Sequence, residues 1–398
     1  MLKSEDYDKE ILDQSNIDIL TIDGSQLEGG GQILRISLAL SSILNRKIKI
    51  IKIRGNRDKP GLKNQHTASC NILALVCNGK LTGCKVDSNE IEYLPEHLNI
   101  KTGSYECDIG SAGSIGLVIQ QILPCIIFGK EKTVINMKGG TIVSHSPSTV
   151  YIRDVLIDIL KFYGFNFSVE TSRHGIFPIG GGYCKIEVEP VKELKPVEFT
   201  KRGLLKSVLI KLVYSQNMNN EGRVETILKD IQKEMKKLIN KHLKDYTEEQ
   251  LEEIKIITDT YKINITKGGH TMFIENILYF ENTRITFEYL YSEKKFKNIT
   301  ENEYNGKIIS VAEDVLLDNF ICLDEFTVDH LIIFSALANG KSILHIGEVS
   351  KHTITALTVI QSFLPKFKFN IIPQESKVLK DKINNIIEIE GIAFKRII

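Results

Sequence analysis

Two consecutive stretches of the chain repeat one order of strand-like and helix-like patterns, and this repetition constrains the fold more than any other feature. The first stretch predicts strands at 19–24, 48–54, 84–87 and 90–94, with helices ending near 44 and 78. The second predicts strands at 105–109, 133–138, 166–170 and 183–189, with helices ending near 128 and 162. Both have the order β-α-β-α-β-β, with a period of roughly 80 to 90 residues that is typical of repeated supersecondary units.

A third copy is interrupted by an insertion. Its first strand is predicted at 197–200 and its other elements at 325–338, 342–346, 351–364, 368–372 and 385–390. Residues 201–318 between them differ in composition and include a long amphipathic helix with a stripe formed by Val224, Leu228, Ile231, Met235 and Leu238. Thr247 and Gln250 form a capping box that opens another helix. We therefore predict an α/β (α+β) protein with a core domain of three repeats, 17–200 and 319–398, and a smaller α/β insert domain, 201–318.

A triple glycine separates the first strand from the first helix, in the run Glu28-Gly29-Gly30-Gly31-Gln32-Ile33-Leu34-Arg35. Glycine lets the backbone approach a bound anion closely, and the N-terminus of the helix adds unpaired N–H donors. An ordinary tight turn would explain the glycines alone. The polar side chains of Glu28, Gln32 and Arg35 favour a binding site, because a turn does not need them.

The segment 46–63 is strongly basic, although the whole chain has a formal net charge of only +1. It contains eight lysines and arginines but only one acidic residue, Asp58. A basic patch of this kind fits a phosphate-bearing partner, and arginine can hold phosphate through two parallel hydrogen bonds. A solvated strand edge protected by lysines explains the lysines equally well.

His352 lies in the first turn of a predicted helix for which Ser350 is a suitable N-cap. The positive end of the helix disfavours imidazolium, so the ring is expected to be neutral and nucleophilic near pH 7. By position alone, a surface histidine is the more common explanation. Gln120 has a similar ambiguity, because a lone glutamine in an apolar run is more often a core residue than a ligand contact.

The cysteines and the apolar runs exclude several classes of protein. Seven cysteines with no Cys-x-x-Cys pair argue against a disulfide framework and a zinc site. The longest apolar run, 117–128, is too short to span a bilayer, and the acidic segment 1–16 does not resemble a signal peptide. We expect a soluble protein of a reducing compartment, with no membrane partner.

Several motifs in one order resemble those of the RNA 3′-terminal phosphate cyclases. They are segments 28–35, 54–66, 109–120, 139–141, 174–182 and 349–353, within a resemblance that covers about 17–200 and 320–390. The resemblance implies three β-α-β-α-β-β units with an α/β insert. It also implies conversion of an RNA 3′-phosphate to a 2′,3′-cyclic phosphodiester, using ATP and Mg²⁺ or Mn²⁺.

The resemblance also implies roles for individual residues. His352 matches the nucleophile that becomes adenylylated, and the other catalytic positions are Glu28, Arg35 and Arg54, with Glu28 as the metal-binding or proton-handling residue. The expected RNA-binding residues are Arg57, Gln65 and His66. The expected nucleotide contacts are Gln120, Pro147, Phe326, Asp329 and His330. Phe326 and His330 depart from the tyrosine and glutamine that are common in the family, which puts the details of nucleotide contact in doubt.

Two other functions compete with this one. A sister branch of the family acts without cyclase activity in ribosome assembly (18S rRNA processing), but it typically lacks the nucleophilic histidine and the intact glycine turn. An enolpyruvyl transferase has a similar repeat architecture but lacks the histidine segment. Segment 336–340 resembles eukaryotic members, so we expect residence in the nucleus, or else in the cytoplasm; the oligomeric state is not indicated.

Overall fold

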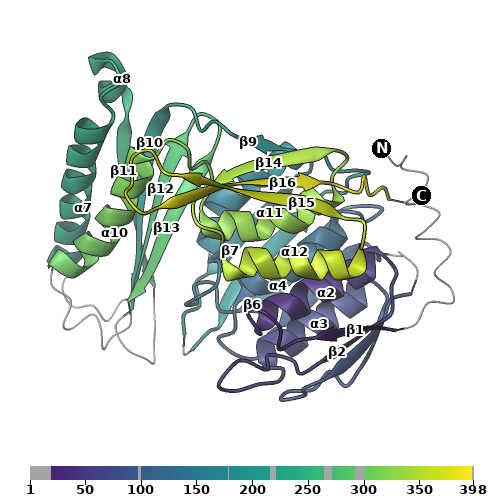
Figure 1. The fold of residues 1–398 in the computed structure, drawn as a ribbon. Coiled ribbons are helices and arrows are strands. Elements are labelled where there is room, and N and C mark those ends of the chain that lie inside the picture. Colours follow the sequence, from purple (N-terminus) through teal and green to yellow (C-terminus); the bar gives the residue numbers. More distant parts are fainter. Residues whose placement is uncertain are drawn as a thin grey trace.

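The computed structural model describes residues 19–96, 100–177, 179–215, 221–263, 271–291 and 301–396. The predicted start of the core domain at residue 17 and the acidic segment 1–16 lie outside these residues. Figure 1 shows the insert, with its helices α7 and α10, on one side of the larger core.

The first repeat is a four-stranded sheet with two helices. Its elements are β1 (Leu20–Asp23), α2 (Gly31–Ile43), β2 (Ile48–Ile51), α3 (Asn64–Val76), β3 (Lys80–Thr82) and β4 (Ile91–Leu94). The strand order is β1-β2-β4-β3. The β1–β2 pair is parallel and the other pairs are antiparallel.

The second repeat has the same topology, in the order β5-β6-β8-β7. Its elements are β5 (Gly103–Asp108), α4 (Ile115–Ile126), β6 (Thr133–Gly139), α5 (Thr149–Tyr151), η2 (Ile152–Leu156), α6 (Ile157–Leu160), η3 (Lys161–Tyr163), β7 (Phe167–Arg173) and β8 (Gly182–Val188). The second helix is thus a series of short segments, in which η2 is a π-helical turn.

The third repeat has the order β9-β14-β16-β15 and confirms the predicted interruption. Its elements are β9 (Glu198–Phe199), α11 (Glu325–Leu337), β14 (Lys341–Ile346), α12 (Lys351–Phe363), β15 (Lys368–Glu375) and β16 (Ile383–Glu390). β9 precedes the insert and pairs in parallel with β14, which follows it. The α/β class with three repeated units is therefore confirmed.

The insert is a sheet of order β11-β10-β12-β13 with helices on one face. Its elements are β10 (Leu205–Ser215), α7 (Glu221–His242), α8 (Glu248–Glu253), β11 (Lys255–Ile263), β12 (Met272–Phe280), β13 (Arg284–Tyr291) and α10 (Glu301–Leu317). All five residues of the predicted stripe on α7 are buried against this sheet. The capping box of Thr247 and Gln250 opens α8 as predicted.

Two strand predictions in the first repeat are wrong. The strand expected at 84–87 lies at Lys80–Thr82, and Gly83, with a φ of +79°, ends it. The strand expected to continue to residue 54 ends at Ile51, because Lys52 and Arg54 have φ values of +49° and +55° that a strand cannot contain.

The helices of the three repeats share one core. α2 contacts α12, α4 and α3, while α11 packs on α12. Buried residues of all three repeats belong to one hydrophobic cluster. Because α2 lies between α12 and α4, its N-terminal turn lies where the three repeats meet. Within the described part of the chain, no helix is long and apolar enough to cross a membrane.

Candidate active site

The triple glycine forms the start of α2, which begins at Gly31 without a side-chain cap. A Cβ at Gly31 would lie 2.8 Å from Nη1 of Arg35 and 3.0 Å from Nε2 of His66. The missing side chain therefore lets two polar groups approach the backbone at the helix start. Glu28 borders the same turn: its Oε2 accepts the Gly30 N–H at 2.9 Å, and its Oε1 forms an ion pair with Arg57.

Arg35 connects the first repeat to the second. Its Nε donates to Oε1 of Gln120 at 2.8 Å, and its Nη2 donates to Oε1 of Gln32 at 2.7 Å. Burial lowers the pKa of Arg35 to about 10, so the guanidinium is still charged at neutral pH. The predicted contact residue Gln120 is thus fixed by the predicted catalytic arginine.

Asp329 of α11 fixes the start of α12. Its Oδ1 accepts from Oγ of Ser350 at 2.8 Å and from Oγ1 of Thr353 at 2.7 Å. Ser350 is the N-cap that the sequence predicts, accepting the Thr353 N–H at 2.8 Å. Burial raises the pKa of Asp329 to about 7, against the effect of the two hydroxyl donors. These contacts orient the helical turn that carries His352.

His352 is half-buried, and its Nδ1 has no hydrogen-bond partner among the residues that the structure describes. The pKa of the ring is lowered, mainly by burial and then by the positive charge of Arg35, with a smaller contribution from Arg57. The lowered pKa of His352 agrees with the neutral ring that the sequence predicts. The cause differs, because the sequence argument relied on the helix end alone.

A small cavity lies between the three repeats, next to Arg35, and most of its lining is apolar, from Ile36, Leu123, Ile333 and Phe334. It has a volume of about 10 Å³, enough for one water molecule, and Gln32, Gln120, Asp329 and His330 contribute to its lining. Nε2 of Gln32 and Nε2 of His330 are buried there without a partner in the described ranges. Predicted site residues from all three repeats therefore converge on one point.

Gln65 and His66 lie in the first turn of α3, beside the glycine turn. Oε1 of Gln65 accepts the Ser114 N–H at 2.7 Å, and Nδ1 of His66 accepts the Lys63 N–H at 3.1 Å. Burial, together with Arg35 and Arg54, lowers the pKa of His66 to about 3, so its ring is neutral. Ser114 was not predicted as a site residue, although it lies within the motif segment 109–120.

Arg54 and Arg57 differ in how they are held. Nη1 of Arg54 donates to the carbonyl oxygens of Lys59 and Gly61, both at 2.8 Å, and so holds the turn that follows it. The Arg57 side chain is 47% exposed and binds Glu28, whose own side chain is only 8% exposed. Arg57 is therefore the more accessible of the two for a phosphate.

Tyr151, which the sequence did not indicate, lies four residues after Pro147 and next to the rings of Phe326 and His330. Pro147 is buried, with its carbonyl against Gly116 at the start of α4. The Tyr151 ring lies 6.2 Å from the ring of Phe326 and 6.1 Å from that of His330. Nδ1 of His330 donates to the Phe326 carbonyl at 2.7 Å, which leaves Nε2 as an acceptor.

A dedicated metal cage is absent from the described residues, where no group of three or more His, Cys, Asp or Glu side chains is placed to hold an ion. Glu28 can contribute one carboxylate. Mg²⁺ is commonly held by one or two carboxylates together with substrate phosphates. The donor set therefore fits a metal that arrives with a nucleotide rather than one that the protein holds by itself.

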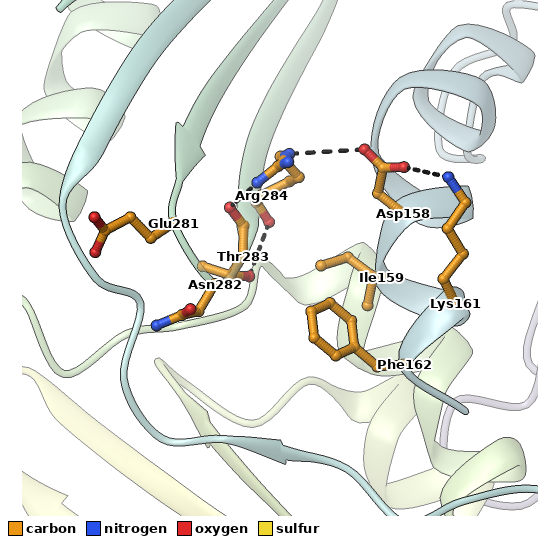
Figure 2. Close-up of a pocket in the computed structure, with 8 residues that line it drawn as sticks. All are labelled: Asp158, Ile159, Lys161, Phe162, Glu281, Asn282, Thr283 and Arg284. Atoms are coloured by element: carbon orange, nitrogen blue, oxygen red, sulfur yellow. Dashed lines mark hydrogen bonds and ion pairs between the residues drawn. The ribbon is translucent and has the colours of Figure 1, made fainter. Parts of the chain in front are cut away.

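A larger cavity of about 370 Å³ lies at the junction of insert and core (Figure 2). Its lining residues are Asp158, Ile159, Lys161, Phe162, Glu281, Asn282, Thr283 and Arg284. None of the predicted site residues is among them. Larger cavities, of about 690 and 630 Å³, lie elsewhere and are not lined by the predicted site residues either, so cavity size does not locate the candidate site.

An α/β protein of three repeats, with a helix-start histidine beside a glycine turn and buried arginine, has close counterparts among known proteins. The family model for RNA 3′-terminal phosphate cyclase matches residues 26–371. A Dictyostelium discoideum protein named "Probable RNA 3′-terminal phosphate cyclase" is 34% identical, covering 94% of this chain and 83% of the relative. RNA 3′-terminal phosphate cyclases of Staphylothermus marinus and Drosophila melanogaster are 31% and 30% identical, covering 94% and 89% of this chain and 99% and 92% of the relatives.

The chain belongs to the RNA 3′-terminal phosphate cyclase family. The resemblance seen in the motifs is thereby confirmed, and with it membership of a family of RNA-processing enzymes.

Proposed function

We propose that this protein converts an RNA 3′-phosphate to a 2′,3′-cyclic phosphodiester in an ATP-dependent reaction with a covalent histidine–AMP intermediate. The observation that carries the proposal is the placement of His352. Its ring is half-buried, has an unpartnered Nδ1 within the described residues, and feels the charges of Arg35 and Arg57 at the glycine turn. The names of the relatives favour this reaction over the non-catalytic role in ribosome assembly.

In the first step, a ring nitrogen of His352 attacks the α-phosphorus of ATP. An N–P bond forms, the P–O bond to the β-phosphate breaks, and pyrophosphate leaves. A lowered pKa keeps the lone pair of the imidazole available for this attack. Arg35 and Arg57 would offset the negative charge that develops on the phosphate oxygens, and the open N–H groups at the start of α2 would add neutral donors.

In the second step, an oxygen of the RNA 3′-phosphate attacks the adenylylated histidine and takes the AMP, which frees the ring. The neighbouring 2′-OH then attacks the 3′-phosphorus and expels AMP. Arg57, Gln65 and His66 are the proposed RNA-binding residues and Arg54 supports their loop. Glu28 is the proposed proton acceptor for the 2′-OH, and with the substrate phosphates it could hold Mg²⁺ or Mn²⁺, which would neutralise phosphate charge.

The first test is protein labelling. Incubation with α-labelled ATP and Mg²⁺ should leave label on the protein, and His352→Ala should abolish it. His345→Ala is the matched control, because His345 stacks on Phe320 at 4.3 Å outside the site and should keep the label. Label that persists in His352→Ala would remove this residue from its role.

The second test concerns the RNA end. An RNA with a 3′-phosphate should become resistant to phosphatase only when ATP is present, whereas the same RNA with a 3′-OH should not react. Equal reaction of both RNAs would contradict the proposed substrate. Residence in the nucleus or the cytoplasm stays a prediction, which imaging of a fluorescent fusion can test.

A further inference from the structure

The insert presents a polar row to the core. Lys211 of β10, Glu275 of β12 and Glu288 of β13 are register partners on three adjacent strands, so their side chains share the sheet face opposite α7 and α10. Val213 and Phe273 on the same face pack against residues of the second repeat. Polar side chains within an apolar interface are costly unless they have a specific partner.

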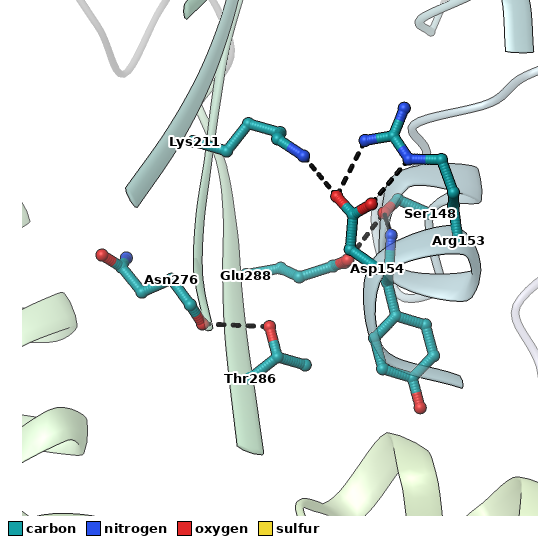
Figure 3. Close-up of polar contacts among 8 residues, drawn as sticks. Ser148, Arg153, Asp154, Lys211, Asn276, Thr286 and Glu288 are labelled. Carbon is teal, nitrogen blue, oxygen red and sulfur yellow. Dashed lines mark hydrogen bonds and ion pairs between the residues drawn. The ribbon is translucent and has the colours of Figure 1, made fainter. Parts of the chain in front are cut away.

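Glu288 of the insert accepts a hydrogen bond from the second repeat. Oγ of Ser148 donates to its Oε1 at 2.7 Å, and the same Oγ accepts the Tyr151 N–H at 2.9 Å, which caps α5 (Figure 3). Ser148 directly follows Pro147, one of the expected nucleotide contacts. The carboxyl group of Glu288, in the insert, therefore fixes the residue that directly follows Pro147, one wall of the proposed nucleotide site.

The same strand, β13, also forms a hydrogen bond with the third repeat. The Thr286 N–H, two residues before Glu288, donates to Oδ2 of Asp324 at 3.2 Å. Asp324 caps α11 by accepting the Thr327 N–H at 2.8 Å and its hydroxyl at 3.0 Å. The helix so capped carries Phe326, Asp329 and His330, which form the expected opposite wall.

Tyr151 joins the two walls. Its hydroxyl is 2.9 Å from Oγ1 of Thr327, and both side chains are fully buried. Its ring lies beside Phe326 and His330, as described above. The contacts therefore form a closed circuit, which we call the insert brace: Glu288, Ser148, Tyr151, Thr327, Asp324 and Thr286.

A purely structural role would be served by other contacts of the interface. Lys211 of the insert forms an ion pair with Asp154 of the second repeat, and Arg153 of the same repeat also donates to Asp154 at 2.6 Å (Figure 3). Arg284 lies 3.8 Å from Asp158 (Figure 2). Since these ion pairs already attach the insert to the core, the insert brace is not needed for attachment. This leaves positioning of the expected nucleotide contacts as its role.

We propose that Glu288 is a positioning residue for nucleotide binding, acting through Ser148 and Tyr151 to set the spacing between the Pro147 and Phe326 walls. This inference rests on the proposed function, because the walls bind a nucleotide only if that function is correct. It gives the insert an indirect part in binding ATP.

The test measures the use and the binding of ATP in two ways. Protein labelling gives the KM for ATP and the maximal rate, and calorimetry gives the Kd for ATP. Glu288→Ala should raise both KM and Kd about tenfold, with the maximal rate changed less than about threefold. Glu288→Gln should behave as the wild type, because its amide oxygen still accepts from Ser148. Tyr151→Phe keeps the ring, loses the bond to Thr327, and should raise KM and Kd a few-fold.

Asp158→Asn is the matched control. It weakens another contact between β13 and the same helical region of the second repeat, and should leave KM and Kd unchanged. Wild-type values in both Glu288→Ala and Tyr151→Phe would overturn the inference, as would an equal effect of Asp158→Asn. Failure of the proposed function looks different, since the wild type itself would take no label and bind no ATP.

Discussion

Arg35 is the residue on which the candidate site is centred, because it contacts the second repeat and contributes to lowering the pKa of three histidines. Its planar guanidinium binds Gln120 and Gln32 through different nitrogens. It also contributes to lowering the pKa of His66, of His330 and of His352. One side chain thus combines positioning with electrostatics.

Arg35→Lys should retain the fold and lose most of the labelling by ATP. A lysine ammonium cannot reproduce the two-directional geometry of the guanidinium, and misplacement of about 1 Å can cost roughly 100-fold in rate. The initial rate of labelling measures the loss, and circular dichroism checks the fold. Arg46→Lys is the control, because the Arg46 side chain donates to the Phe363 carbonyl, which is not part of the candidate site. A labelling rate within about threefold of the wild type would rule out the assigned role of Arg35.

Local residue patterns predicted much of the local geometry of the candidate site, because a glycine turn or an N-cap depends on only a few neighbouring residues. Ser350 was recognised as a cap, and Glu28 and Arg35 were recognised beside the glycines. The hydrogen bonds from Arg54 to Lys59 and Gly61 were not anticipated, since they depend on a φ of +55° that no pattern in the sequence indicates.

At the scale of the element, α12 depends on its first turn. Ser350→Ala removes the cap and one of the two hydroxyls that donate to Asp329, so the variant should lose about 1 to 2 kcal/mol of unfolding free energy. Urea denaturation measures the loss. Ser362→Ala near the other end of the helix removes only an exposed bond to the Thr358 carbonyl and should be almost neutral. Equal stability of the two variants would mean that the cap does not stabilise the helix.

Helices were predicted more accurately than strands, for a physical reason. The stripe on α7 and the capping box of α8 are local signals, whereas a strand exists only where a neighbouring strand pairs with it. β3 is a three-residue strand, Lys80–Thr82, held by antiparallel pairing with β4, and its alternation is too short to identify. The π-helical turn Ile152–Leu156 also left no recognisable pattern.

At the scale of the whole molecule, the repeat pattern predicted three units but not how they meet. The junction brings together Arg35 and Gln120, which are 85 residues apart, and Ser148 and Glu288, which are 140 residues apart. A single sequence carries no direct signal for such pairs. The resemblance to a family supplied the first pair, and nothing supplied the second, because the insert offered no motif to match.

The interface between insert and core should make the stability of the protein depend on pH. Burial raises the pKa of Glu288 to about 8 from an ordinary value of 4.5, so the folded protein keeps a proton there that the unfolded chain has already lost. Stability should therefore fall as pH rises between about 4.5 and 8, by up to about 1.4 kcal/mol per pH unit for this one group. The raised pKa values of Glu275 and Asp324 act in the same direction.

Comparison with Glu288→Gln isolates this effect. His66 and His330, which are buried, and His174, which is half-buried, have lowered pKa values, so they increase stability with rising pH, but only below about 6.5. Between pH 6.5 and 8 the wild type should lose stability faster than Glu288→Gln, whose amide does not titrate. Thermal unfolding at half-unit pH steps measures the difference in Tm, which should shift steadily in favour of the variant. Parallel Tm curves across this window would mean that Glu288 loses its proton well below pH 6.5 in the folded protein.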